Sequence, residues 1–166
     1  MLLDLHRLNE MHPLLPPSEA AGYAYRGALA LQRGGHAPGV ATTVDDCGTP
    51  VGTTVGWVGV DPSGEGQVDR ISITEDGATA FSLAFLSVAR GWTVELRLQR
   101  FQFGDWLMID SAGDYVALEV SGIEGDYLPG RLREKLDQVR KVPFCDARFA
   151  SVVAFGAPQA ALAQAE

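Results

Sequence analysis

Cysteine is scarce in this sequence, and so are long apolar runs. The two cysteines, Cys47 and Cys145, lie far apart and form neither a CxxC pair nor a cluster with histidine, so we expect no zinc site and two free thiols. No run of about 18 apolar residues occurs, which excludes a membrane-spanning helix of ordinary length. The first twelve residues are interrupted by charges where a secretory segment needs an apolar stretch, so we expect a cytoplasmic protein with no membrane association.

Lysine is equally scarce, because only Lys135 and Lys141 occur among the 13 basic residues. The formal net charge of −8 repels phosphate backbones and disfavours general binding of nucleic acid. The basic residues are unevenly distributed, since eight of the 13 fall between positions 97 and 148. This asymmetry is modest and leaves the first 90 residues distinctly acidic.

The length of 166 residues, 46% of them hydrophobic, suits a single domain, 1–166, with one buried core. Residues 1–70 predict a helix that begins near Pro17 and ends at Gly34, then a β-hairpin between Gly39 and Asp61. A loop is expected over 61–66. We interpret this N-terminal region as an elaboration of the part that follows.

Residues 75–156 predict a helix, three strands, a second helix and a strand, which is an α/β fold with a mixed central sheet flanked by helices. The first helix, 75–90, is expected to begin at Thr74 as its cap. Leu98 and Phe101 are out of phase, which favours a bulge near 99–100 or the end of that strand. The alanine-rich tail suits a short helix. The remaining predicted elements are strands over 92–98, 105–110 and 114–122, a helix over 128–139 and a buried strand over 149–155.

Two acidic residues, Asp105 and Glu119, stand in otherwise apolar strands. A three-residue loop of Ser111, Ala112 and Gly113 sets Asp105 directly opposite Glu119 on one face, whereas a two-residue turn puts the acids on opposite faces. Carboxylates so placed suit a magnesium or manganese ion. Two structural alternatives stay open: Asp105 can cap a turn, and Glu119 can pair with Arg97 or Lys135.

The segments 104–110 (GDWLMID) and 115–122 (YVALEVSG) resemble the paired motif strands of the PD-(D/E)XK, or restriction-endonuclease-like, superfamily. The resemblance covers about residues 75–156. It implies that Asp105 and Glu119 bind a catalytic divalent ion, with a further acid from Glu75 or, as another possibility, Glu19. In that family a lysine stands two residues after the second acid and activates the attacking water, but Ser121 occupies that position here.

Because this lysine is missing, two functional hypotheses stand side by side, one without catalysis and one with it. The sequence leaves open whether any catalysis survives. Our leading hypothesis is a degenerate, non-catalytic member that serves as a binding or assembly component of a nucleic-acid-processing or defence system. It would contact a protein partner or a second copy through Arg131, Arg133 and Arg140. The alternative is a magnesium- or manganese-dependent nuclease that uses Asp105 and Glu119 with a relocated lysine, Lys135.

Overall fold

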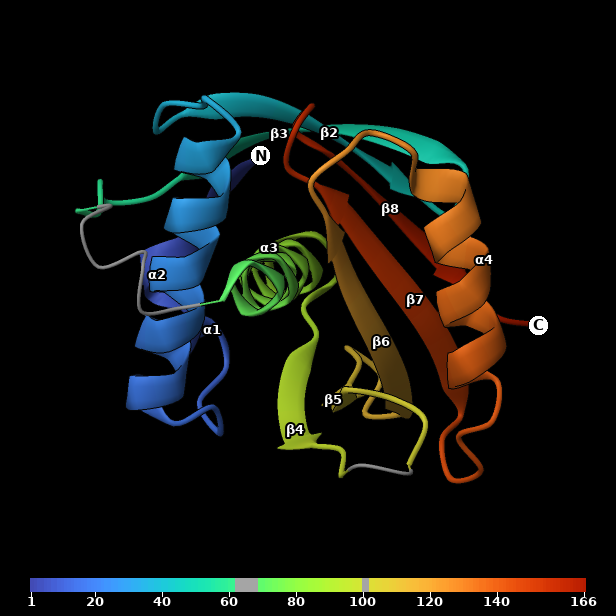
Figure 1. Ribbon diagram of the computed structural model, residues 1–166. Coiled ribbons are helices and arrows are strands. Elements are labelled where there is room, and N and C mark those ends of the chain that lie inside the picture. Colours follow the sequence, from blue (N-terminus) through green and yellow to red (C-terminus); the bar gives the residue numbers. More distant parts are fainter. Residues whose placement is uncertain (62–68, 100–101) are drawn as a thin grey trace.

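The computed structural model describes residues 1–61, 69–99 and 102–166, and the loop expected over 61–66 lies almost wholly outside them. One eight-stranded mixed sheet runs through the molecule in the order β1-β3-β2-β8-β7-β6-β5-β4 (Figure 1). The strands are β1 (Leu2–Asp4), β2 (Val40–Asp46), β3 (Thr49–Gly56), β4 (Thr93–Arg97), β5 (Trp106–Ile109), β6 (Tyr115–Ile123), β7 (Ala147–Ala154) and β8 (Gln159–Gln164).

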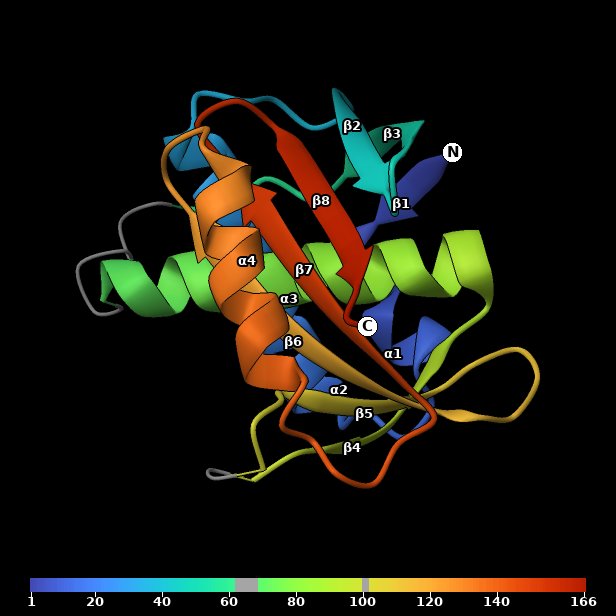
Figure 2. The ribbon, with the colours of Figure 1, turned by 90° about the vertical axis from the view of Figure 1, so that its right-hand side faces the viewer.

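Helices cover both faces of this sheet. One face carries α3, with α2 packed on the outer side of α3, and the other face carries α4 (Figures 1 and 2). The mixed α/β fold with helices on both sides of one sheet is therefore as predicted. The helices are α1 (Leu8–Met11), α2 (Pro17–Arg33), α3 (Arg70–Arg90) and α4 (Leu128–Val139), and a short 3-10 turn, η1 (Leu5–Arg7), precedes α1.

The long helix α3 is buried on several sides because it lies between the sheet and α2. Close approach of α2 and α3 depends on glycine. A Cβ on Gly27 would meet the Cβ of Ala80 at 3.2 Å, and a Cβ on Gly77 would meet the Cβ of Ala30 at 3.1 Å. Twelve residues of α3 are buried because the helix is covered on two sides, so α3 lacks the broad polar face of a surface helix.

The predicted start of α3 at Thr74 is wrong, because the helix begins at Arg70. Asp69 is the capping residue, and its carboxylate accepts a hydrogen bond from the backbone N–H of Ser72 at 2.9 Å. Gly91 ends the helix in the left-handed conformation (φ 69°), as expected. The hydroxyl of Thr74 instead donates to the carbonyl of Arg70 within the helix at 2.9 Å.

The predicted order of elements from α3 to β7 is confirmed. β4 ends at Arg97, close to the place where either a bulge or the end of the strand was expected. A bulge lies earlier, between Val94 and Leu96, and residues 100 and 101 are outside the described part of the chain. Strands β4, β5 and β6 form an antiparallel meander, and β7 returns through α4 to run parallel to β6. The carboxyl ends of β6 and β7 therefore lie at the same edge of the sheet.

The predicted C-terminal helix is wrong, because the alanine-rich segment is strand β8. It pairs antiparallel with β7 and parallel with β2 of the N-terminal β2-β3 hairpin. This strand joins the two halves of the chain into one continuous sheet. The hairpin itself was predicted, and it turns at Cys47 and Gly48, both with positive φ.

Candidate functional site

The candidate site lies where β5 stops and β6 continues. Among the described residues, β5 pairs with β6 only along Tyr115–Leu118. Beyond Leu118, the backbone N–H groups on that edge of β6 donate to side chains instead of to a neighbouring strand. The backbone N–H of Val120 donates to Oδ2 of Asp105 at 2.8 Å, and that of Gly122 donates to Oε2 of Glu75 at 3.4 Å. Two carboxylates from distant parts of the sequence are thereby brought to one strand edge.

The three-residue loop sets the register of β5 and β6, which runs from Trp106 opposite Leu118 to Ile109 opposite Tyr115. Asp105 directly precedes β5, and its N–H donates to the carbonyl of Leu118, the residue before Glu119, at 2.9 Å. Gly113 closes the loop with φ 94°, the conformation that this loop length requires of its last residue. The alternative two-residue turn is therefore excluded.

Glu119 is buried and bound through one oxygen only. Nζ of Lys135 lies 2.6 Å from Oε1, and the two side chains are 13% and 2% exposed. Oε2 of the same carboxylate has no hydrogen-bond partner among the described residues. An unpaired buried carboxylate oxygen is costly, which makes this position a candidate for binding a cation or a proton.

Burial and charge repulsion shape the acidity of this pair. Burial raises the pKa of Glu119 to about 7, the negative charge of Asp105 adds to the rise, and Lys135 opposes it. Burial likewise raises the pKa of Asp105, against the stabilising hydrogen bond from Val120 and the charge of Lys135. Glu119 therefore changes protonation near neutral pH, which is typical of acids at functional sites.

A second cluster surrounds Ser121, the residue that stands where the resemblance leads one to expect a lysine. The buried hydroxyl of Ser121 donates to Oε1 of Glu75 at 3.1 Å and accepts from Nε of Arg131 at 2.8 Å. Arg131 also reaches Glu75 (3.4 Å) and Glu134 (3.0 Å). Glu75, rather than the exposed Glu19, is thus the acid that the fold brings here.

Helix α4 places both Lys135 and Arg131 against β6 because the spacing of residues along the helix matches that along the strand. Four helical residues span about 6 Å, nearly the same as two strand residues. Contacts between α4 and β6 therefore recur with steps of four and two: Ala117 with Val139, Glu119 with Lys135, and Ser121 with Arg131.

The three arginines expected on a partner surface do not behave alike. Arg131 points into the site and is about one-third exposed. Arg133 is exposed on α4, and Arg140, the exposed residue that caps the end of α4, pairs with Asp137 of the helix. The expectation of a solvated basic face did not foresee the inward contacts of Arg131. The matched spacing of α4 and β6 is the signal that would have identified them.

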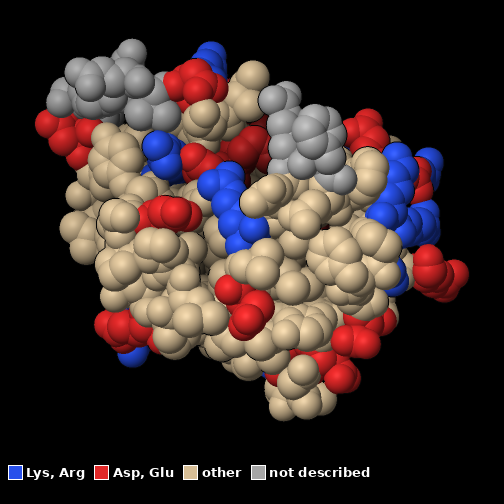
Figure 3. Space-filling view, turned by 90° about the horizontal axis from the view of Figure 1, so that it is seen from below, with Lys and Arg blue, Asp and Glu red and all other residues tan. Residues whose placement is uncertain are grey.

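On the α3 side, Asp105 borders a small cavity of about 80 Å³. Tyr23, Asp76 and Arg97 also line it, and the Arg97 guanidinium lies 5.8 Å from the ring centre of Trp106. In the view from below, acidic and basic side chains lie side by side on this face (Figure 3). Arg97 is thus near Asp105, whereas the ion pair to Glu119 comes from Lys135.

The donor set fits a hard divalent ion held by few protein ligands. Within residues 1–61, 69–99 and 102–166, no group of three or more histidine, cysteine or acidic side chains is arranged to hold a metal. Magnesium, however, commonly binds through one or two carboxylates together with water and substrate phosphate. Asp105 and Glu119, whose Oε2 has no partner among the described residues, are the two carboxylates that would serve.

Comparisons with protein-family models, curated proteins and solved structures found no match to this chain. Across the described part of the chain, no helix has the length and apolar character needed to cross a membrane.

Proposed function

We propose that this chain is a divalent-metal-dependent phosphodiesterase that cleaves nucleic acid, similar in architecture to PD-(D/E)XK nucleases. One observation carries the proposal: the buried Glu119 carboxylate faces Lys135 with one oxygen and leaves the other unpaired beside Asp105. A carboxylate buried only for structural reasons is expected to have both oxygens satisfied.

The order α3-β4-β5-β6-α4-β7 supports the likeness to this superfamily, as do Asp105 just before β5 and Glu119 on β6, whose charges interact. The family lysine has no counterpart at Ser121, but Lys135 reaches the motif acid from α4. Relocation of the cation to a neighbouring helix accounts for its absence from the strand.

Each side chain has a role that follows from its contacts. Asp105, oriented by the Val120 N–H, and Glu119 would hold the ion. Bound magnesium or manganese supplies a water of lowered pKa and stabilises negative charge on the phosphate. Lys135 places an ammonium group beside Glu119, where it favours the ionised carboxylate and can orient the nucleophile. Arg131 offers a guanidinium for a substrate phosphate.

A second candidate, a non-catalytic binding component, is favoured by the contacts of Glu75. This carboxylate is already engaged by Ser121, Gly122 and Arg131. The cluster can therefore stabilise α3, β6 and α4 without any ligand, and the exposed Arg133 and Arg140 remain for a protein partner or a second copy.

Cleavage assays distinguish the two candidates. Single- and double-stranded DNA and RNA are incubated with manganese or magnesium and with wild type, Asp105→Asn or Glu10→Gln. The control residue Glu10 is an exposed acid that pairs with Arg7 outside the candidate site. We expect Asp105→Asn to reduce cleavage by at least about 100-fold and Glu10→Gln to leave it nearly unchanged.

Failure of the wild type to cleave any of these substrates would contradict the enzymatic proposal. Loss of partner binding on charge reversal of Arg133 and Arg140 would then support the second candidate.

A further inference from the structure

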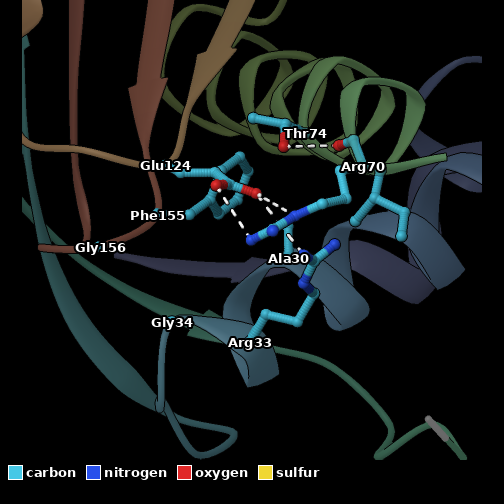
Figure 4. A pocket seen from close by; sticks show the side chains of 9 residues that line it. Ala30, Arg33, Gly34, Arg70, Thr74, Glu124, Phe155 and Gly156 are labelled. Carbon is cyan, nitrogen blue, oxygen red and sulfur yellow. Dashed lines mark hydrogen bonds and ion pairs between the residues drawn. The ribbon is translucent and has the colours of Figure 1, made fainter. Parts of the chain in front are cut away.

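A separate cavity of about 340 Å³ opens at the carboxyl ends of the parallel strands β6 and β7. Its walls come from the end of α2, the start of α3 and the segments that follow the two strands (Figure 4). Crevices beyond the carboxyl ends of strands are the usual ligand sites of α/β sheets. The volume lies within the range of small-molecule sites.

Backbone contacts between neighbouring elements define the cavity walls. A Cβ on Gly34 would lie 2.2 Å from the carbonyl oxygen of Phe155, and a Cβ on Gly156 would lie 2.4 Å from that of Glu124. Both glycines line the cavity, and any larger residue would separate the elements that enclose it. The wall around the opening is therefore formed by main chain as well as by side chains.

Two guanidinium groups from different helices converge on one carboxylate in this cavity. Nη2 of Arg33, on α2, lies 3.6 Å from Oε1 of Glu124. Arg70, on α3, contacts both oxygens of Glu124: Nη2 of Arg70 lies 3.3 Å from Oε2, and Nε of Arg70 donates to Oε1 at 3.3 Å. Figure 4 shows both arginines directed toward Glu124. Two guanidinium groups on different helices are thus brought to one carboxylate.

Glu124 is held weakly enough to be displaced. The Glu124 side chain is 55% exposed and that of Arg70 is 72% exposed, so water and salt screen the ion pair between them. A phosphate monoester carries nearly two negative charges at pH 7 and more acceptor oxygens than a carboxylate. Arginine pairs prefer such a group because the planar guanidinium matches its oxygens.

We propose that this cavity binds the phosphate group of a small phosphorylated molecule, with Arg33 and Arg70 as its ligands. Glu124 acts as the internal anion that the phosphate displaces. Binding here does not require hydrolysis at Asp105 and Glu119, although Thr74 on the cavity wall directly precedes Glu75 of the candidate site. The cavity is thus a second ligand site beside the first.

Calorimetric titration with inorganic phosphate and with phenyl phosphate tests this site. Arg33→Gln and Arg70→Gln should each weaken binding by at least about tenfold, because each removes a charge-assisted hydrogen bond. Glu124→Gln should tighten binding, because the competing carboxylate is lost. Tighter binding of phenyl phosphate identifies an ester as the occupant, and tighter binding of inorganic phosphate identifies the free anion.

The ion pair between Arg7 and Glu10 provides matched controls. Its side chains are 61% and 57% exposed, close to those of Arg70 and Glu124, and it lies outside the cavity. Arg7→Gln and Glu10→Gln make the same changes in net charge and should leave phosphate binding unaltered. Absence of saturable binding to the wild type overturns the proposal, and so does an equal response of Glu124→Gln and Glu10→Gln.

Discussion

Replacement of Glu119 by glutamine should change how stability depends on pH. The ordinary pKa of a glutamic acid is 4.5, and that of Glu119 is raised to about 7. The folded protein therefore binds this proton more tightly than the unfolded chain does. Glu119 contributes stability that is complete below pH 4.5 and is lost as the pH rises through about 7.

The size of this loss follows from the two pKa values. Each pH unit between them corresponds to about 1.4 kcal/mol, so the full interval corresponds to about 3 kcal/mol. Glutamine does not titrate, keeps the shape of the side chain and can still accept from Lys135. The free energy of unfolding of Glu119→Gln minus that of wild type should therefore rise by about 3 kcal/mol between pH 4.5 and 8.

Urea denaturation at several pH values measures this difference. Asp110→Asn is a suitable control, because hydrogen bonds from the backbone of Asp114 lower the pKa of the exposed Asp110. Its contribution to stability is lost only as the pH falls below the ordinary value, so its difference curve should be flat over the same range. A flat curve for Glu119→Gln would refute the raised pKa and the burial argument built on it.

Three further perturbations follow from other contacts. His12 is buried between the Leu83 carbonyl and the Val94 N–H, and burial lowers its pKa, so stability should fall as the pH drops below about 6.5; unfolding titrations of His12→Gln should lack this slope. Gly122→Ala should destabilise the protein by about 1–3 kcal/mol, because its Cβ would lie 2.1 Å from an α3 carbonyl, while Gly52→Ala, which has open space, should change thermal stability little. The hydroxyls of Ser82 and Ser151 form a buried hydrogen bond of 2.8 Å, so each alanine variant should cost about 1–3 kcal/mol and the double variant less than their sum in a denaturation cycle.

Local sequence signals were sufficient for the register of the candidate site. The length of the loop that ends in Gly113 fixes which residues of β5 and β6 face each other, and antiparallel pairing then brings Asp105, just before β5, to the part of β6 that precedes Glu119. Local signals did not fix the start of α3, because Asp69 and Thr74 are both good capping residues. Only the packing of the first turn, which buries Ile73, distinguishes them.

Contacts between distant segments could not be read from local propensity. Alanine favours helices, yet 159–164 forms a strand because β7 and β2 supply hydrogen-bonding partners on both sides. Similarly, a polar helix face suggested that Arg131 is solvated, whereas the crossing of α4 over β6 directs it to Ser121. Both errors arise from tertiary pairing, which local propensity does not report.

The central claim is that Asp105 and Glu119 together bind a divalent ion. Calorimetric titration of manganese into wild type and Asp105→Asn at pH 7, in two buffers of different ionisation enthalpy, tests it directly. We expect saturable binding to wild type with release of a proton, because metal binding must ionise Glu119 near its pKa of about 7, and we expect loss of that binding in the variant. Absence of binding to wild type, or equal binding to the variant, would contradict the metal site and the nuclease proposal with it.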